Sequence, residues 1–226
     1  ERKELSEDKA LVRFPEPGTV VIPLSMHSGA PANPTVQAGD HVKIGQKIGE
    51  AAAFISGNVH SSVSCTVTAV ENRPHPTRGG GVLSVVIEND KKNEIADTVK
   101  PYGEIEDLTP EQIVDIVKES GIVGMGGAGF PTSVKLAPNK PIDAVILNGC
   151  ECEPILTADH RVLLEYADDV IYGLRAMMKA VSAPRGIIAV EDNKPDAIEL
   201  LQAKAEELDG IEVIGDARHD VAGGMH

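Results

Sequence analysis

The chain has 226 residues, which is enough for one or two domains with a buried core. It contains no Trp and only three Phe and three Tyr, so we expect a core of aliphatic side chains. The formal net charge of −14 argues against a nucleic-acid partner, because phosphate binding needs a basic surface. No apolar run approaches the length of a membrane span and no secretory signal opens the chain, so we expect a soluble, intracellular protein.

The first part of the chain, residues 13–89, is predicted to form short strands separated by turns, as in a small barrel or sandwich. The expected strands are Val20–Ile22, Val63–Val70 and Val82–Ile87, with loops at 72–76 and 79–81. A polar, charged stretch at 90–107 follows, and we place a linker at 96–108.

The pattern of the second part is that of alternating helices and strands. Thr109-Pro110-Glu111-Gln112 predicts a capped helix that ends at Gly121. A parallel α/β layer is expected beyond it, because strands and amphipathic helices alternate. Its expected strands are 143–147, 186–190 and 211–214; its expected helices begin near Thr157, with apolar positions continuing to Met178, and span about 195–208.

Glycine turns at fixed offsets mark the strand-rich part. Val36, Gly39-Asp40, Val42 and Gly45 are followed by Val59-His60-Ser61-Ser62, and residues 34–71 together resemble the biotinyl and lipoyl carrier fold. A carrier needs a lysine at the hairpin tip, but this chain has Phe54-Ile55-Ser56-Gly57 there, so a docking or structural module is favoured over a carrier.

Three further side chains in this part are interpreted as structural. His27 and His60 have no additional ligand at metal-binding spacing, so they are expected at the surface or in loops. Cys65 occupies a turn-like position where glycine would fit more easily.

Two motifs in the second part point to ligand chemistry. Glycines between Gly121 and Gly129 would let backbone amides approach a phosphate or a flat ring, and Lys135 would add positive charge. Asn148 to Pro154 follows a predicted strand, and the carboxyl ends of parallel strands are where α/β folds place ligands. The alternative for this second motif is a loop that caps the next helix.

The cysteines exclude one class of site. Cys65, Cys150 and Cys152 are too few for a four-cysteine iron–sulfur cluster, and their odd number fits a reducing compartment. Cys150-Glu151-Cys152 is tightly spaced for chelation, so we expect no metal site.

Together the two motifs resemble a known family. They read Gly124-x-Gly126-Gly127-Ala128-Gly129-Phe130-Pro131-Thr132-x-x-Lys135 and Asn148-x-x-Glu151-x-Glu153-Pro154. This looks like the flavin-binding subunit of respiratory complex I, and the whole chain looks closer to the C subunit of the Rnf complex, a ferredoxin:NAD⁺ oxidoreductase. The resemblance implies an α+β multidomain protein: a barrel-sandwich module (1–95), the linker (96–108) and the N-terminal part of a Rossmann-like FMN- and NADH-binding domain (109–226).

The resemblance also implies roles for individual residues. Those matching positions near FMN are Gly124, Gly126, Gly127, Gly129, Lys135, Asn148 and Glu151, and those near NADH are Phe130 and Glu153. Cys150 stands where the complex I relative has an acidic residue, which puts that flavin contact in doubt.

The function implied is electron transfer between NADH and iron–sulfur carriers through FMN. The family continues beyond this chain with two 4Fe–4S clusters, so the chain is expected to be a fragment. Its expected partners are the other subunits of the membrane Rnf complex, NAD(H) and, indirectly, ferredoxin, at the cytoplasmic face of the membrane. The alternatives are a soluble relative serving an amino-acid or cobalamin reductase, and a non-catalytic docking scaffold.

Overall fold

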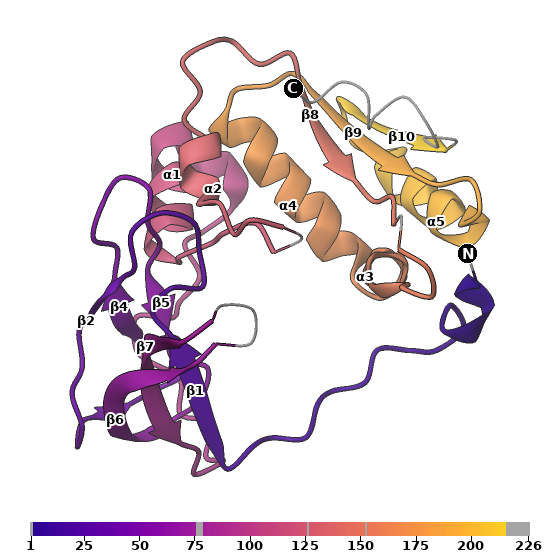
Figure 1. Ribbon diagram of the computed structural model, residues 1–226. Helices are drawn as coiled ribbons and strands as arrows, with labels where there is room; N and C mark the ends of the chain where they lie inside the picture. Colours follow the sequence, from indigo (N-terminus) through magenta and orange to yellow (C-terminus); the bar gives the residue numbers. More distant parts are fainter. Residues whose placement is uncertain (1, 76–78, 126, 152, 216–226) are drawn as a thin grey trace. The chain divides into compact units, whose positions relative to one another are not determined.

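The computed structural model describes residues 2–75, 79–125, 127–151 and 153–215 (Figure 1). The chain forms two compact units: Phe14–Ala137, here called the barrel unit, and Glu1–Arg13 with Pro138–His226, here called the α/β unit. These units differ from the expected division at residues 95 and 108. Residues 109–137 pack with the strand-rich part, and the first residues of the chain pack with the last part. The domain boundaries themselves stay a prediction.

The barrel unit contains two sheets around an aliphatic core. Leu24, Val42, Ile48, Val67 and Ile87 are each 0% exposed, which confirms the expected composition of the core. One sheet has the order β1 (Thr19–Pro23), β7 (Gly81–Glu88), β6 (Cys65–Pro74), β3 (His41–Val42), and the other β2 (Asn33–Pro34), β4 (Lys47–Glu50), β5 (Val59–His60).

Both predicted loops of this unit extend too far: the loop 72–76 is wrong over residues 72–74, and the loop 79–81 is wrong at Gly81, where β7 begins. Strand β6 continues through Asn72 to Pro74, where Arg73 pairs with Val82 of β7 and Pro74 pairs with Gly81. The long antiparallel ladder with β7 overrides the weak strand propensity of Asn and Pro at its end. Pro76 lies outside the described residues.

The helical part of the barrel unit begins as the sequence predicts. In α1 (Pro110–Glu119), the Gln112 amide donates to Thr109 Oγ1 at 3.2 Å, and the Thr109 amide donates to Gln112 Oε1 at 2.8 Å. This reciprocal pair is a capping box. The helix ends at Glu119 with Ser120 as its C-cap, and Gly121 follows with a φ of +67°. The barrel unit also contains the 3₁₀ turn η2 (Ile105–Asp107) and the one-turn helix α2 (Thr132–Lys135).

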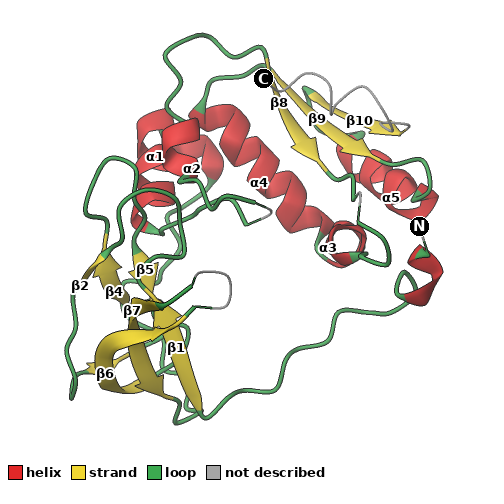
Figure 2. Ribbon diagram, viewed as in Figure 1, coloured by secondary structure: helices red, strands yellow, loops and turns green. Residues whose placement is uncertain are grey.

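The α/β unit is a three-stranded parallel sheet with its helices packed on one face (Figure 2). Its strand order is β10, β9, β8, so the expected parallel layer is confirmed. Ile146 (53% exposed) and Ile214 (38% exposed) lie on the opposite face, as the alternation along a strand requires. The elements are η1 (Lys3–Leu5), β8 (Ala144–Asn148), α3 (Ala158–Glu165), α4 (Ala167–Ala180), β9 (Arg185–Val190), α5 (Pro195–Ala205) and β10 (Ile211–Gly215).

Two helix predictions in this unit need correction. The expected long helix from Thr157 is divided at Tyr166, whose φ of −130° is not helical. The apolar periodicity does not reveal the break, because Leu163 and Ala167 on either side of it both face the core. The last helix ends at Ala205 rather than near Leu208. No helix among the described residues combines the length and the apolar character that a membrane crossing requires.

Candidate functional site

The expected site residues divide between the two units. The glycine loop, Phe130 and Lys135 belong to the barrel unit, whereas Asn148, Glu151 and Glu153 belong to the α/β unit. Gly126 lies outside the described residues.

Backbone hydrogen bonds close the glycine loop. The Gly124 amide donates to the Phe130 carbonyl at 3.0 Å, and the Thr132 amide donates to the Ile122 carbonyl at 3.0 Å. Val123 and Pro131 form an antiparallel bridge between these two bonds. Met125, Gly127 and Ala128 consequently lie between the two sides of a closed loop, and Met125 is 94% exposed.

The glycines of this loop serve two different purposes. Gly129 has a φ of +65°, and a Cβ there would lie 3.0 Å from the Met26 carbonyl oxygen. The Ser28 amide donates to the Gly129 carbonyl at 3.0 Å, so this glycine permits close packing on the barrel. A Cβ at Gly127 would meet nothing within 4 Å, so Gly127 faces open space that a ligand can occupy.

Lys135 is the cation of the loop. Its exposed ammonium lies 5.9 Å from the centre of the Phe130 ring and 4.0 Å from the place of a Cβ on Gly124. It makes no ion pair with any described residue. An exposed, unpaired ammonium beside backbone that lacks side chains is suited to an anion such as a phosphate.

Asn148 ends strand β8 in the α/β unit. Its Oδ1 accepts a hydrogen bond from the Cys150 amide at 3.1 Å, which starts the turn out of the strand. Gly149 donates its amide to the Ala189 carbonyl at 2.8 Å, and a Cβ there would come within 3.1 Å of the same oxygen. The side chain of Asn148 is exposed, which leaves its amide nitrogen available to a ligand.

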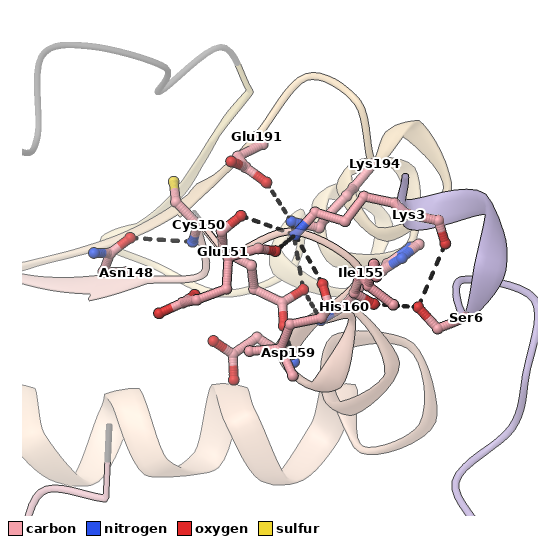
Figure 3. Close-up of polar contacts among 12 residues, drawn as sticks. Lys3, Ser6, Asn148, Cys150, Glu151, Ile155, Asp159, His160, Glu191 and Lys194 are labelled. Atoms are coloured by element: carbon pink, nitrogen blue, oxygen red, sulfur yellow. Dashed lines mark hydrogen bonds and ion pairs between the residues drawn. The ribbon is translucent and has the colours of Figure 1, made fainter. Parts of the chain in front are cut away.

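Glu151, by contrast, is only 2% exposed and its carboxylate is already engaged (Figure 3). Oε1 accepts from the Asp159 amide at 2.8 Å and Oε2 accepts from the His160 amide at 3.3 Å, so the carboxylate caps α3. This arrangement gives Glu151 the helix-capping role that the sequence left open as an alternative. Its contact with FMN stays a prediction, as does that of the exposed Glu153 with NADH.

Two buried charges lie beside Glu151 that the sequence did not predict. Lys194 Nζ lies 3.6 Å from Glu151 Oε2 and 2.5 Å from Glu191 Oε2. Burial acts to raise the pKa of Glu191, but the hydrogen bond and charge of Lys194 outweigh it and lower that pKa. Burial and the Glu151 charge raise the pKa of Asp159. Lys194 directly precedes Pro195 at the start of α5, but no local signal connects it with residue 151.

His27 and His60, two of the histidines of the barrel unit, are more buried than surface residues, although His27 does lie in a loop, after β1. His27 is 4% exposed, and its Nε2 lies 3.0 Å from the Ala30 carbonyl oxygen and 3.2 Å from Ser56 Oγ. His60 is half-buried in β5, and burial lowers its pKa. A Cβ on Gly57 would lie 3.5 Å from the His27 ring, so the missing side chain leaves room for this buried imidazole.

The cysteines and their acidic neighbours form no metal centre in the part of the chain that the structure describes. Its residues include no set of three or more His, Cys, Asp or Glu side chains arranged to hold a metal ion. Cys65 and Cys150 are free thiols there, and Cys152 lies outside the described residues.

Both parts of the chain match known protein families. Residues 1–92 match the RnfC barrel sandwich hybrid domain, and residues 117–225 match the Nuo51 FMN-binding domain. The second match includes the glycine loop and the β8 strand end together. The chain is therefore a barrel-sandwich module followed by an FMN-binding-type α/β domain.

Full-length relatives align with the chain across both of these domains. The chain is 50% identical over 202 residues to the C subunit of the Na⁺-translocating ferredoxin:NAD⁺ oxidoreductase complex of Acetobacterium woodii, covering 88% of this chain and 45% of that protein. It is 42% identical over 215 residues to the proton-translocating counterpart of Clostridium ljungdahlii, covering 94% of this chain and 47% of that protein. The chain belongs to this RnfC family, and it spans about half the length of these relatives.

The structure of an NAD⁺-reducing [NiFe]-hydrogenase in the air-oxidized state also aligns with the chain. The alignment covers 53% of this chain and 24% of that one, at 24% identity and a TM-score of 0.45. A likeness of that extent supports no inference about function.

Proposed function

We propose that this chain binds FMN and NADH and passes electrons from NADH toward iron–sulfur carriers, as part of an ion-translocating ferredoxin:NAD⁺ oxidoreductase. The observation that carries the proposal is the unpaired Lys135 ammonium beside the open glycine loop, within the segment that matches the Nuo51 FMN-binding domain. The relatives from Acetobacterium woodii and Clostridium ljungdahlii are both named as subunits of such complexes.

Each of the two units, taken by itself, has groups that suit part of a flavin mononucleotide. Lys135 would neutralise the phosphate, and Gly127 would let the cofactor approach the backbone. Asn148 has a free amide nitrogen for a ring or ribityl oxygen, and Phe130 and Glu153 would contact the dinucleotide. Bound FMN supplies the chemistry that accepts a hydride and releases its electrons singly. The protein's contribution is to hold, orient and shield the two ligands.

The wider assignment is part of the same proposal. Two 4Fe–4S clusters would lie in the C-terminal half of the full-length protein, and the other subunits of the complex would hold the protein at the cytoplasmic face of the membrane. A soluble relative serving an amino-acid or cobalamin reductase would use the same FMN and NADH contacts. The docking scaffold is favoured by one observation only, the exposed Phe54 (82%) and Ile55 (39%) at the carrier-like hairpin tip.

The test is FMN titration of the full-length protein, followed by flavin bleaching on addition of NADH. Lys135→Ala is expected to weaken FMN binding at least about tenfold, because a phosphate loses its cationic partner. Lys140→Ala removes an equally exposed lysine near by in the sequence and is expected to bind as the parent does. A parent protein that binds no FMN would support the scaffold instead, and equal affinities in the two variants would refute the role of Lys135.

A further inference from the structure

The first residues of the chain are fastened to the loop that follows β8. Lys3, in η1, is 8% exposed, and its ammonium donates to three backbone carbonyls: Glu151 at 3.0 Å, Glu153 at 2.9 Å and Leu156 at 2.7 Å (Figure 3). An ammonium has three N–H donors, so Lys3 is fully satisfied by this one loop. Lys3 therefore fixes the course of the loop backbone, whatever side chains the loop carries.

The same loop contains a strained residue. Ile155 has a φ of +69°, which is costly for a β-branched side chain. Its carbonyl accepts a hydrogen bond from Ser6 Oγ, one turn beyond Lys3. Such a conformation persists only where the surroundings enforce it, and here the enforcing groups come from the amino-terminal segment.

Hydrophobic burial does not hold this loop. Ile155 and Leu156 are 47% and 45% exposed, and Glu153 and Pro154 are exposed as well. Polar contacts with the amino-terminal segment are therefore what shapes residues 153–156. The Glu151 carboxylate and Lys194 fix the loop only at its beginning.

The amino-terminal segment is itself anchored further along α3. Arg161 Nη1 donates to the Glu7 carbonyl at 3.2 Å, and the Leu11 amide donates to Glu165 Oε1 at 2.9 Å. Residues 3–11, here called the strap, thus run from the loop to the end of α3. The strap joins the loop and the helix that follows it into one unit.

We propose that Lys3 is a positioning residue, which through the strap holds the strained loop 153–156 in the conformation that presents Glu153 to the dinucleotide. The role of Lys3 in dinucleotide binding rests on the proposed function. Its role in fixing the conformation of residues 153–156, here called the hold on the loop, does not. Lys3 itself touches neither ligand, because its three donors are used by the loop backbone.

The hold is tested by hydrogen exchange of peptides spanning 153–161 in the full-length protein without ligands. Lys3→Met keeps the length of the side chain and removes the ammonium, and is expected to raise exchange in these peptides about tenfold. Lys9→Met makes the same change at an exposed lysine of the strap and should exchange as the parent does. If Lys3→Met does not fold, Ser6→Ala, which removes the hydroxyl that donates to the Ile155 carbonyl and, at 3.4 Å, to the Lys3 carbonyl, should still raise exchange about two- to threefold. Unchanged exchange in the folded variants would overturn the proposal.

The positioning role is tested by NADH oxidation at full FMN occupancy. Lys3→Met should raise KM for NADH at least fivefold with kcat within twofold, because loop geometry and not the reacting groups has changed. A loosened loop with an unchanged KM would refute the positioning role. A parent protein that oxidises no NADH would refute the proposed function, and with it that role, while the exchange result would still decide whether Lys3 holds the loop.

Discussion

Lys194 Nζ lies 3.6 Å from Glu151 Oε2, with the two side chains only 2% and 1% exposed. The pair connects the start of α5 with the loop after β8, across 43 residues of sequence. Glu151 also caps α3, so one carboxylate joins two helices and the loop. Charges this deeply buried are tolerated only when paired.

Removing the Lys194 ammonium is therefore expected to destabilise the protein strongly. Lys194→Met should lower the free energy of unfolding by about 3–5 kcal/mol, because Glu151 and Glu191 would be left buried without their cation. Lys204→Met, which breaks the exposed pair with Asp168, should cost less than about 1 kcal/mol. Urea denaturation of both variants measures the difference. If both variants lost similar amounts of unfolding free energy, the buried ion pairs of Lys194 would contribute no more to stability than the exposed pair of Lys204.

Acid should weaken the same cluster. The pKa of Glu191 is lowered in the folded protein, so its contribution to stability is present above the unfolded pKa of about 4.3 and is lost as pH falls through the lower folded value. Glu191→Gln should therefore flatten the acid limb of a plot of urea midpoint against pH.

Asp159 provides a control, because its effect on the pH dependence of stability has the opposite sign to that of Glu191. Its pKa is raised, so ionised Asp159 costs stability above its folded pKa, and that cost disappears on acidification. Asp159→Asn should accordingly raise the urea midpoint at neutral pH and steepen its fall in acid. If Glu191→Gln and Asp159→Asn gave parallel plots of urea midpoint against pH, both the lowered pKa of Glu191 and the raised pKa of Asp159 would be contradicted.

The sequence predicts elements whose signals are local. The Thr109 capping box, the aliphatic barrel core and the parallel strands were all found, because each depends on neighbours within one element or on its periodicity. The candidate site is likewise proposed from local signals, its glycines and its strand end. The Lys3, Glu151 and Lys194 contacts could not be predicted, because they join residues far apart whose own neighbourhoods carry no signal. Polar partners of that kind are fixed only by the packed fold.

Two glycines of the loop should respond differently to a methyl group. Gly129→Ala is expected to lower the free energy of unfolding by about 1–2 kcal/mol, because φ is positive and the new Cβ would crowd the Met26 carbonyl. Gly127→Ala should change stability by less than about 0.5 kcal/mol, since its Cβ would meet open space. The order should be reversed in an FMN titration. If the backbone at Gly127 binds the phosphate, Gly127→Ala should bind FMN more weakly than Gly129→Ala. Unchanged FMN affinity in Gly127→Ala would remove Gly127 from the site.

Cys65 lies in β6 opposite Val42 with a φ of +144°, a backbone region that is essentially reserved for glycine. Relief of that strain, about 1–3 kcal/mol, exceeds the entropic cost of a new glycine, about 0.5–1 kcal/mol. Cys65→Gly should therefore raise the free energy of unfolding by about 1 kcal/mol in a urea titration under reducing conditions. Cys65→Ala removes the same thiol but keeps the Cβ, so it should gain nothing. An equal gain in both variants would mean that the thiol, and not the backbone conformation, is what costs stability at this position.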